Sequence, residues 1–258
     1  MDEVRIPEAI SASLRQELDK LAKGGRILEL NGHGDRIFGH VALRDPEGRG
    51  FWLKRHYISL GELFDHRDFI LCDFDGKQLM GPGRRHSEWP IHAEIFRARP
   101  DLNATAHTHP FHTVIYSATS KPLGSISGPS KPPPRFEGTS EYIDTPELGR
   151  RLAASLGKDS KIAIMRHHGV IFAGRSIEEM VLNGIDVEHR CRQMLLVASA
   201  SAGTPFEWPD DAELQRKFGD ESKRVGGGNA QWDYFCRVLA RAEAQGDPRL
   251  SYECLLGE

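Results

Sequence analysis

The chain has 258 residues, of which 39% are hydrophobic and 28% are charged, and its formal net charge is −3. This composition is typical of a soluble globular protein and excludes the strongly basic profile of a nucleic-acid-binding domain. The N-terminus has no apolar segment of the secretory type, no apolar run approaches the ~20 residues of a membrane span, and the four scattered cysteines are typical of reduced cytoplasmic thiols. We expect one domain over residues 1–258, with a core at about 8–200 and a C-terminal helical extension at about 205–258.

The first part of the chain is predicted to form one helix followed by short strands. Apolar residues at helical spacing predict an amphipathic helix over Glu8–Ala22 that ends at Gly24-Gly25. The glycine-rich segment Asn31–Arg44 is interpreted as a loop that runs into a strand, because it lacks the G-K-[ST] ending of a phosphate-binding loop. The turns and strands predicted next are the turn Asp45–Arg49, the strand Gly50–Lys54, the strand Phe69–Asp73 and the turn Asp75-Gly76.

The second part alternates predicted helices and strands. Ser87 is the predicted N-cap of a helix that contains Glu88 in its first turn and reaches about Ala98. The segment Leu102–Thr108 is the predicted central strand, and Gly128–Gly138, with four prolines in eleven residues, predicts an ordered lid or a surface loop without regular structure. The other predictions are helices at Pro110–Ala118, Pro146–Leu156, Ser176–Ala200, Asp210–Phe218 and Asn229–Ala244, and strands at Lys161–Met165 and Val170–Ala173.

A candidate metal site lies at the end of the predicted central strand, where His107 and His109 are two residues apart. Residues i and i+2 of a strand point to the same face, so two such imidazoles can hold one divalent cation. A third ligand can come from His167-His168, which ends another apolar run, and a fourth from the segment Ser87–His92. Three histidines, a carboxylate and an open position are the usual set of a catalytic zinc-type site. An H-x-H pair also occurs by chance, or in metal hydrolases of the TIM-barrel type, whose repeated βα units this chain lacks.

Three segments, in this order, resemble the class II aldolase/adducin superfamily. They are S-E-W-P-I-H-A-E-I-F-R-A-R-P-D (Ser87–Asp101), N-A-T-A-H-T-H (Asn103–His109) and R-H-H-G-V-I-F-A-G-R-S-I-E-E-M (Arg166–Met180), and the resemblance extends over roughly Glu8–Ala200. It implies an α/β fold with three α/β/α layers around a central, mainly antiparallel sheet. It also implies a homo-oligomer, often a tetramer with active sites between neighbouring subunits, that acts on a small molecule.

The same resemblance assigns roles to individual residues. The metal ligands would be His107, His109 and His168, and His168 is preferred to His167 because the family pattern has a polar residue before its H-G histidine. Glu88 matches the acid/base glutamate of the family, which can also touch the metal when no substrate is present. We expect one divalent ion per chain, with zinc first and manganese, iron and cobalt as alternatives.

The chain departs from the sugar-phosphate members of the family at three loops. Their hydroxylated T-x-G-N-x-S, T-P-S-G and S-S-E motifs are replaced here by Ile37–Ala42, Lys54–Tyr57 and His86-Ser87-Glu88. Bulky and basic residues in these places favour a carboxylate-bearing substrate over a small sugar phosphate, and an arginine can bind a carboxylate bidentately. The candidate substrate contacts are His40, Arg55, Arg85 and His86.

The segment F-G-H-V-A-L-R, which contains His40, resembles a branch with decarboxylases of hydroxylated aromatic or pyridine carboxylates. We therefore expect a metal-dependent carbon–carbon lyase, foremost a non-oxidative decarboxylase that acts through a metal-stabilised enolate and uses Glu88 for proton transfer. The alternatives are a class II aldolase acting on a hydroxy-keto acid or sugar phosphate, and an adducin-like scaffold, which the complete ligand set opposes. His92 follows Glu88 by one turn, and either lines the site or forms a structural hydrogen bond.

Overall fold

One mixed sheet organises the computed structural model, which describes residues 10–126, 131–201 and 228–255 and the positions 210, 212, 213 and 216. Its strands are β1 (His40–Arg44), β2 (Phe51–Lys54), β3 (Phe69–Cys72), β4 (Gln78–Met80), β5 (Ala104–Thr108), β6 (Arg135–Phe136), β7 (Ile162–Met165) and β8 (Gly169–Gly174). Within the described residues the strand order is β4-β3-β2-β1-β5-β8-β7-β6. The pairing of β6 with β7 is parallel, and the other neighbouring pairs are antiparallel.

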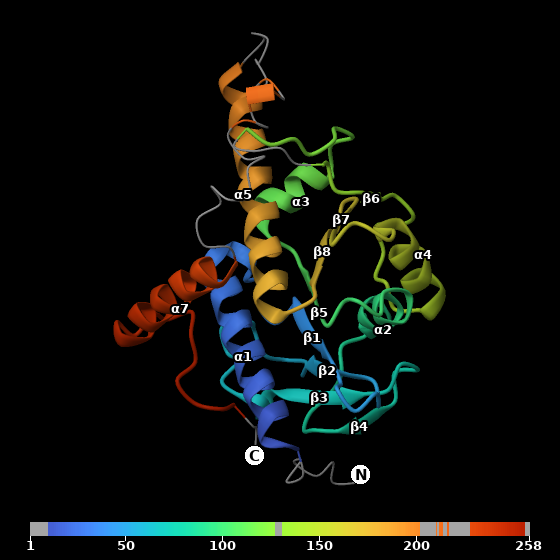
Figure 1. Ribbon diagram of the computed structural model, residues 1–258, viewed down its shortest axis with the longest axis vertical. Coiled ribbons are helices and arrows are strands. Elements are labelled where there is room, and N and C mark those ends of the chain that lie inside the picture. Colours follow the sequence, from blue (N-terminus) through green and yellow to red (C-terminus); the bar gives the residue numbers. More distant parts are fainter. Residues whose placement is uncertain are drawn as a thin grey trace.

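Helices lie on both faces of this sheet (Figure 1). On one face are α2 (Trp89–Ala98) and α4 (Pro146–Leu156), and on the other are α1 (Ala12–Leu28), α3 (Phe111–Ser117) and α5 (Ile177–Ser201), with α7 (Gly228–Ala244) against α1 and α5. The strands are buried on both sides: Val41 and Leu43 pack in the cluster that includes α1, whereas Ala42 packs with residues of α2. Among the described residues, none of the helices has the length and hydropathy that a bilayer span requires.

Helix α1 continues past the predicted end at Gly24-Gly25 and ends at Leu28. Its N-terminus is fixed by Ser11, whose hydroxyl accepts a hydrogen bond from the Leu14 N–H. A Cβ on Gly24 would lie 3.0 Å from a methyl group of Val181 on α5, and one on Gly25 would lie 2.4 Å from Leu63. The predicted end was wrong because these glycines serve as close contact points inside the helix and not as a C-cap.

Other boundaries agree with the prediction or differ by a few residues. Helix α4 has the predicted bounds, because Thr145 caps its first turn and Gly157 follows its last residue. Part of the proline-rich segment lies outside the described residues, but Arg135–Phe136 within it forms the edge strand β6, which corrects the expectation of a purely irregular loop. The Pro134 carbonyl accepts a hydrogen bond from the Ile164 N–H, so the prolines contribute acceptors beside this strand. The predicted helix Asp210–Phe218 lies largely outside the described residues.

Candidate metal centre

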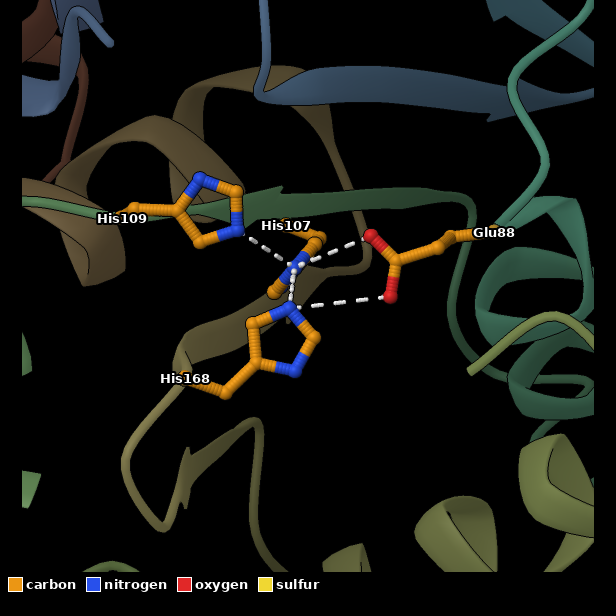
Figure 2. Close-up of side chains that lie close together, drawn as sticks. All are labelled: Glu88, His107, His109 and His168. Carbon is orange, nitrogen blue, oxygen red and sulfur yellow. Dashed lines mark hydrogen bonds and ion pairs between the residues drawn. The ribbon is translucent and has the colours of Figure 1, made fainter. Parts of the chain in front are cut away.

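Four side chains that are far apart in sequence converge at one end of the central strands (Figure 2). Glu88, His107, His109 and His168 each offer one ligand atom, and these atoms lie within 4.8 Å of one another. His107 and His109 come from the end of β5, and His168 comes from the turn before β8. Because β8 pairs with β5, so that Thr108 lies opposite Val170, that turn is placed beside the two histidines. The structure thus brings together the four residues that the sequence suggested.

The three histidines present their Nε2 atoms to one another. The Nε2 of His107 is 3.0 Å from that of His109 and 3.3 Å from that of His168. The Nδ1 of His107 donates to the Val170 carbonyl oxygen at 3.1 Å, which leaves a lone pair on Nε2 in the neutral ring. Burial, reinforced by the neighbouring His109 and His168, holds the pKa of His107 well below its ordinary value, so this ring is neutral at pH 7.

The donor set fits a divalent metal ion. Closely spaced imidazole nitrogens with a carboxylate form the mixed nitrogen and oxygen set that zinc and other first-row ions accept. The Nδ1 of His109 lies 3.2 Å from the Asp35 carboxylate, and a carboxylate in that position is the usual partner of a metal-bound histidine. Burial also lowers the pKa of His168, although the Glu88 carboxylate opposes this effect. His168 is therefore favoured as a neutral ligand.

Glu88 is held at the centre by the backbone of another segment. Its side chain is buried, and its Oε1 accepts a hydrogen bond from the Ile143 N–H at 2.9 Å. Its Oε2 lies 3.7 Å from the Nε2 of His107 and 4.0 Å from the Nε2 of His40. Helix α2 begins at Trp89, so Glu88 and not Ser87 occupies the N-cap position, and its carboxylate does not cap the helix. Because the Glu88 carboxylate makes no hydrogen bond to the backbone N–H groups of the helix, it can point toward the histidines.

A cavity of about 840 Å³ opens over the centre, and its wall contains Glu88, His109 and His168. Its mouth includes exposed apolar side chains, among them Phe111 and Tyr142, which are 68% and 66% exposed. Its described lining combines titratable groups at the base with aromatic surface at the rim.

Two of the four predicted substrate contacts lie in this wall, and two lie elsewhere. His40 and His86 line the cavity. Arg55 instead donates to the Asp68 carboxylate at 3.1 Å and to the Leu255 carbonyl at 2.6 Å. Arg85 lies over the Trp89 ring, 5.2 Å from its centroid, and lines a separate cavity of about 610 Å³. The geometry therefore gives no support to a substrate contact from Arg55, because Asp68 on the neighbouring strand connection already pairs with it.

Sequence reasoning missed several groups that shape the centre. Asp35 lies in the glycine-rich segment that was interpreted only as a loop, and nothing in its spacing relates it to His109. Thr105 precedes His107 by two residues on β5 and so shares its face, which was the available signal. Its hydroxyl lies 2.6 Å from the Nδ1 of His92, and the Nε2 of His92 lies 2.6 Å from the Nδ1 of His40. His92 thus reaches the cavity through His40 and is not part of the cavity's described lining.

Comparisons with known proteins identify a family and several relatives. The model of the Class II Aldolase and Adducin N-terminal domain matches residues 19–195. The Meiotically up-regulated gene 14 protein of Schizosaccharomyces pombe is 27% identical over 191 residues, which cover 71% of this chain and 74% of the relative. The 3,4-dihydroxyphthalate decarboxylase of Arthrobacter keyseri is 30% identical over 212 residues, which cover 76% of this chain and 85% of the relative.

The fold has close counterparts among solved structures. An L-fuculose 1-phosphate aldolase from Glaciozyma antarctica PI12 superimposes with a TM-score of 0.72 at 22% sequence identity, over 93% of this chain and 94% of the other. At that identity the likeness concerns the fold alone. The family model, in contrast, spans more than half of the chain and includes Glu88 and the histidines of the candidate centre. The chain therefore belongs to the class II aldolase and adducin N-terminal domain family.

Proposed function

We propose that this protein is a divalent-metal-dependent carbon–carbon lyase, foremost a non-oxidative decarboxylase of a hydroxylated aromatic carboxylate. The observation that carries the proposal is the convergence of three histidine Nε2 atoms and the Glu88 carboxylate at the base of a cavity with an aromatic rim. The 30% identity to a 3,4-dihydroxyphthalate decarboxylase supports the choice of reaction. The family name alone supports lyase chemistry more broadly.

His107, His109 and His168 would hold one divalent ion, with zinc as the first expectation and manganese, iron or cobalt as alternatives. Such an ion supplies positive charge that draws electrons away from the carbon next to the breaking bond. The protein residues supply the remaining steps. In decarboxylation, the bond between the ring carbon and the carboxylate breaks, its electron pair stays on the ring carbon, and carbon dioxide leaves. A proton must then take its place on that carbon.

Glu88 is the group that we propose delivers this proton. Its Oε2 faces His107 and His40, and the Ile143 N–H holds its Oε1, so the carboxyl group has a fixed direction. In its protonated form it gives the proton to carbon, becomes a carboxylate, and takes up a new proton from solvent. This role needs a carboxyl group close to the metal, but it does not need the carboxyl group as a permanent ligand.

The electrostatics of the cavity favour a carboxylate over a phosphate dianion. Burial is the largest cause that holds the pKa values of His40 and His86 well below their ordinary value, so both rings offer hydrogen bonds without a fixed charge. The arginine in the described lining, Arg36, pairs with Asp35 at 3.1 Å. Among the residues of the described cavity wall, Arg36 is therefore the cationic side chain that a phosphate could meet, whereas the proposed metal and the neutral donors can bind a carboxylate and a phenolic oxygen.

A class II aldolase that acts on a hydroxy-keto acid or sugar phosphate is the second candidate, because the family is named for class II aldolases. Glu88 would then move the proton of the carbon next to the carbonyl group. An adducin-like scaffold is a weaker candidate, since a scaffold has no use for the convergent ligands. The proposal also includes a single domain over residues 1–258, the three-layer α/β/α arrangement and a homotetramer that acts on a small molecule.

A turnover screen of the metal-loaded protein tests the reaction. The screen compares 3,4-dihydroxyphthalate and other hydroxylated aromatic carboxylates with fuculose and ribulose phosphates. Release of carbon dioxide measures decarboxylation, and release of aldehyde measures aldol cleavage. We expect metal-dependent release of carbon dioxide from an aromatic carboxylate. Efficient cleavage of the sugar phosphates alone would mean that the protein is an aldolase and not a decarboxylase. No lyase activity on either class would contradict the proposal.

A further inference from the structure

A buried chain of three polar side chains ends at the cavity. The hydroxyl of Thr105 lies 2.6 Å from the Nδ1 of His92, and the Nε2 of His92 lies 2.6 Å from the Nδ1 of His40. The three residues are at most 2% exposed, so solvent does not compete for these hydrogen bonds. The remaining ring nitrogen of His40, Nε2, lies 4.0 Å from the Glu88 Oε2, and His40 lines the cavity.

The fold places these three hydrogen-bonded side chains next to the candidate metal centre. His40 on β1 is the direct cross-strand neighbour of His107 on β5, so the two rings share one face of the sheet, with centroids 5.3 Å apart. Thr105 lies two residues before His107 and faces the same way. Helix α2, which starts next to Glu88, lays His92 over that face, one turn after the glutamate. Helix α2 and its N-cap residue therefore supply both the residue that contacts His40 and the proposed proton donor.

If both imidazole rings are neutral, the hydrogen bonds that join Thr105, His92 and His40 all donate in one direction. A neutral imidazole has one N–H, so each ring donates through one nitrogen and accepts through the other. If the Thr105 hydroxyl donates to His92, then His92 donates to the Nδ1 of His40, and the Nε2 of His40 carries a hydrogen toward the cavity. In the reverse direction, His40 would present a lone pair there. When Glu88 is in its carboxylate form it accepts hydrogen bonds only, and the first direction then fits the groups around His40.

We propose that His92, supported by Thr105, is a positioning residue that fixes the ring and the tautomer of His40, so that its Nε2–H donates to an oxygen of the substrate. The inference rests on the proposed lyase function and adds to it a group that binds the substrate beside the proposed metal ligands. The oxygen that it recognises is a carboxylate or phenolate oxygen, because the donor is neutral and the acceptor gains most when it is charged. His40 is then a binding residue, and His92 acts only through it.

A purely structural hydrogen bond is the competing explanation, and the direction of the protons separates the two. Neutron diffraction from crystals of the perdeuterated, zinc-loaded wild-type protein locates the deuterons on both rings. We expect deuterium on the Nε2 of His40 and on the Nε2 of His92, with none on either Nδ1. Deuterium on the Nδ1 of His40 and not on its Nε2 would overturn the inference, and this measurement needs neither a variant nor a substrate.

Variants test the consequence for substrate binding. His92→Leu removes the partner of His40, whereas His92→Gln keeps an amide group that can donate to its Nδ1. We expect His92→Leu to lower kcat/KM about 10–100-fold, mainly through KM, which is the loss expected for one hydrogen bond to a charged oxygen, and His92→Gln to recover most of it. His66→Leu, which removes a ring hydrogen bond to Asp19 away from the cavity, is the matched control for lost stability.

Metal content, measured for every variant, should stay at the wild-type value. Unchanged KM in folded, metal-loaded His92→Leu would contradict the positioning role, as would equal losses in His92→Leu and His66→Leu. If the wild-type protein turns over no carboxylate at all, the proposed function fails, while the deuteron positions still decide whether His92 sets the tautomer of His40.

Discussion

Two groups of histidines lie side by side in this protein, and they differ in the groups that their ring nitrogens contact. In the first group, His107, His109 and His168 turn their Nε2 atoms toward one another, and the Nδ1 of His107 donates outward to a backbone carbonyl. In the second group, His40 and His92 bond directly to each other. Three ring nitrogens that meet beside a carboxylate form a set that suits a divalent cation, whereas two rings in line with a hydroxyl group form a chain of hydrogen bonds. His109 and His168 are half-buried and His40 and His92 are buried, so burial differs between the groups, and the partners of each nitrogen indicate its role.

The largest effect is expected when two of the proposed metal ligands in the first group are removed. The double variant His107→Ala/His109→Ala removes two of the three nitrogen ligands, and a divalent ion does not stay bound to one histidine and one carboxylate. We expect about one ion per chain in the wild-type protein and loss of that ion, together with activity, in the variant. Elemental analysis of the purified proteins measures it. Wild-type metal occupancy in the double variant would eliminate this centre.

A second change separates the proton donor from the ligands. Glu88→Gln keeps the size of the side chain and an oxygen that can accept from the Ile143 N–H, but removes the titratable group. General acid–base catalysis contributes about 10²–10⁴-fold, so kcat should fall by about that factor while the metal remains. Full activity would transfer the proton step to another residue. Loss of the metal in this variant would make Glu88 chiefly a ligand.

A third change removes the carboxylate that contacts His109 and leaves all the proposed metal ligands in place. The Asp35 carboxylate lies 3.2 Å from the Nδ1 of His109, and removal of such a partner lowers metal affinity by about 10–100-fold. Competition with a chelator should show this loss in Asp35→Asn. Asp19→Asn, which disturbs another carboxylate–histidine pair away from the centre, is the control. Equal affinity in both variants would mean that His109 is oriented without Asp35.

The smallest effect concerns stability and a histidine outside both groups. His33 is fully buried, and burial lowers its pKa from the ordinary 6.5 to about 4. Below about pH 6.5 the unfolded chain therefore binds a proton that the folded chain excludes, so the free energy of unfolding should fall as the pH decreases from 6.5 to 4. Urea unfolding of the metal-free protein at several pH values measures the slope. His33→Gln should reduce it, and an unchanged slope would assign the effect to other groups.

The sequence predicted the parts of this molecule that depend on local signals. The bounds of α4 follow from Thr145 and Pro146 at its start and Gly157 at its end, and the β5 segment was recognisable from its apolar run. The end of α1 was not predictable, since only the approach of Val181 and Leu63 explains the two glycines. Local signals are reliable where a residue type is needed for backbone geometry, and fail where it is needed for a tertiary contact.

The candidate site divides in the same way. Glu88 and the three histidines lie in segments whose spacing and order carried the family resemblance, so they were predicted before the geometry was known. The partners that orient them were not, because Asp35 and the Ile143 backbone come from segments with no chemical signal of their own. Arg55 was predicted to contact the substrate because it is a basic residue near the site, but its guanidinium group pairs with Asp68 instead. The sequence does not reveal this pairing.

Stepwise return of metal to the stripped protein tests the central claim most directly. Zinc or manganese is added to the chelator-treated enzyme while carbon dioxide release from a hydroxylated aromatic carboxylate is recorded, with the His107→Ala/His109→Ala variant in parallel. The account predicts no release without metal, a rise that reaches its plateau at one ion per chain, and no rise in the variant. Release from the stripped protein, or equal release from the variant, would contradict it.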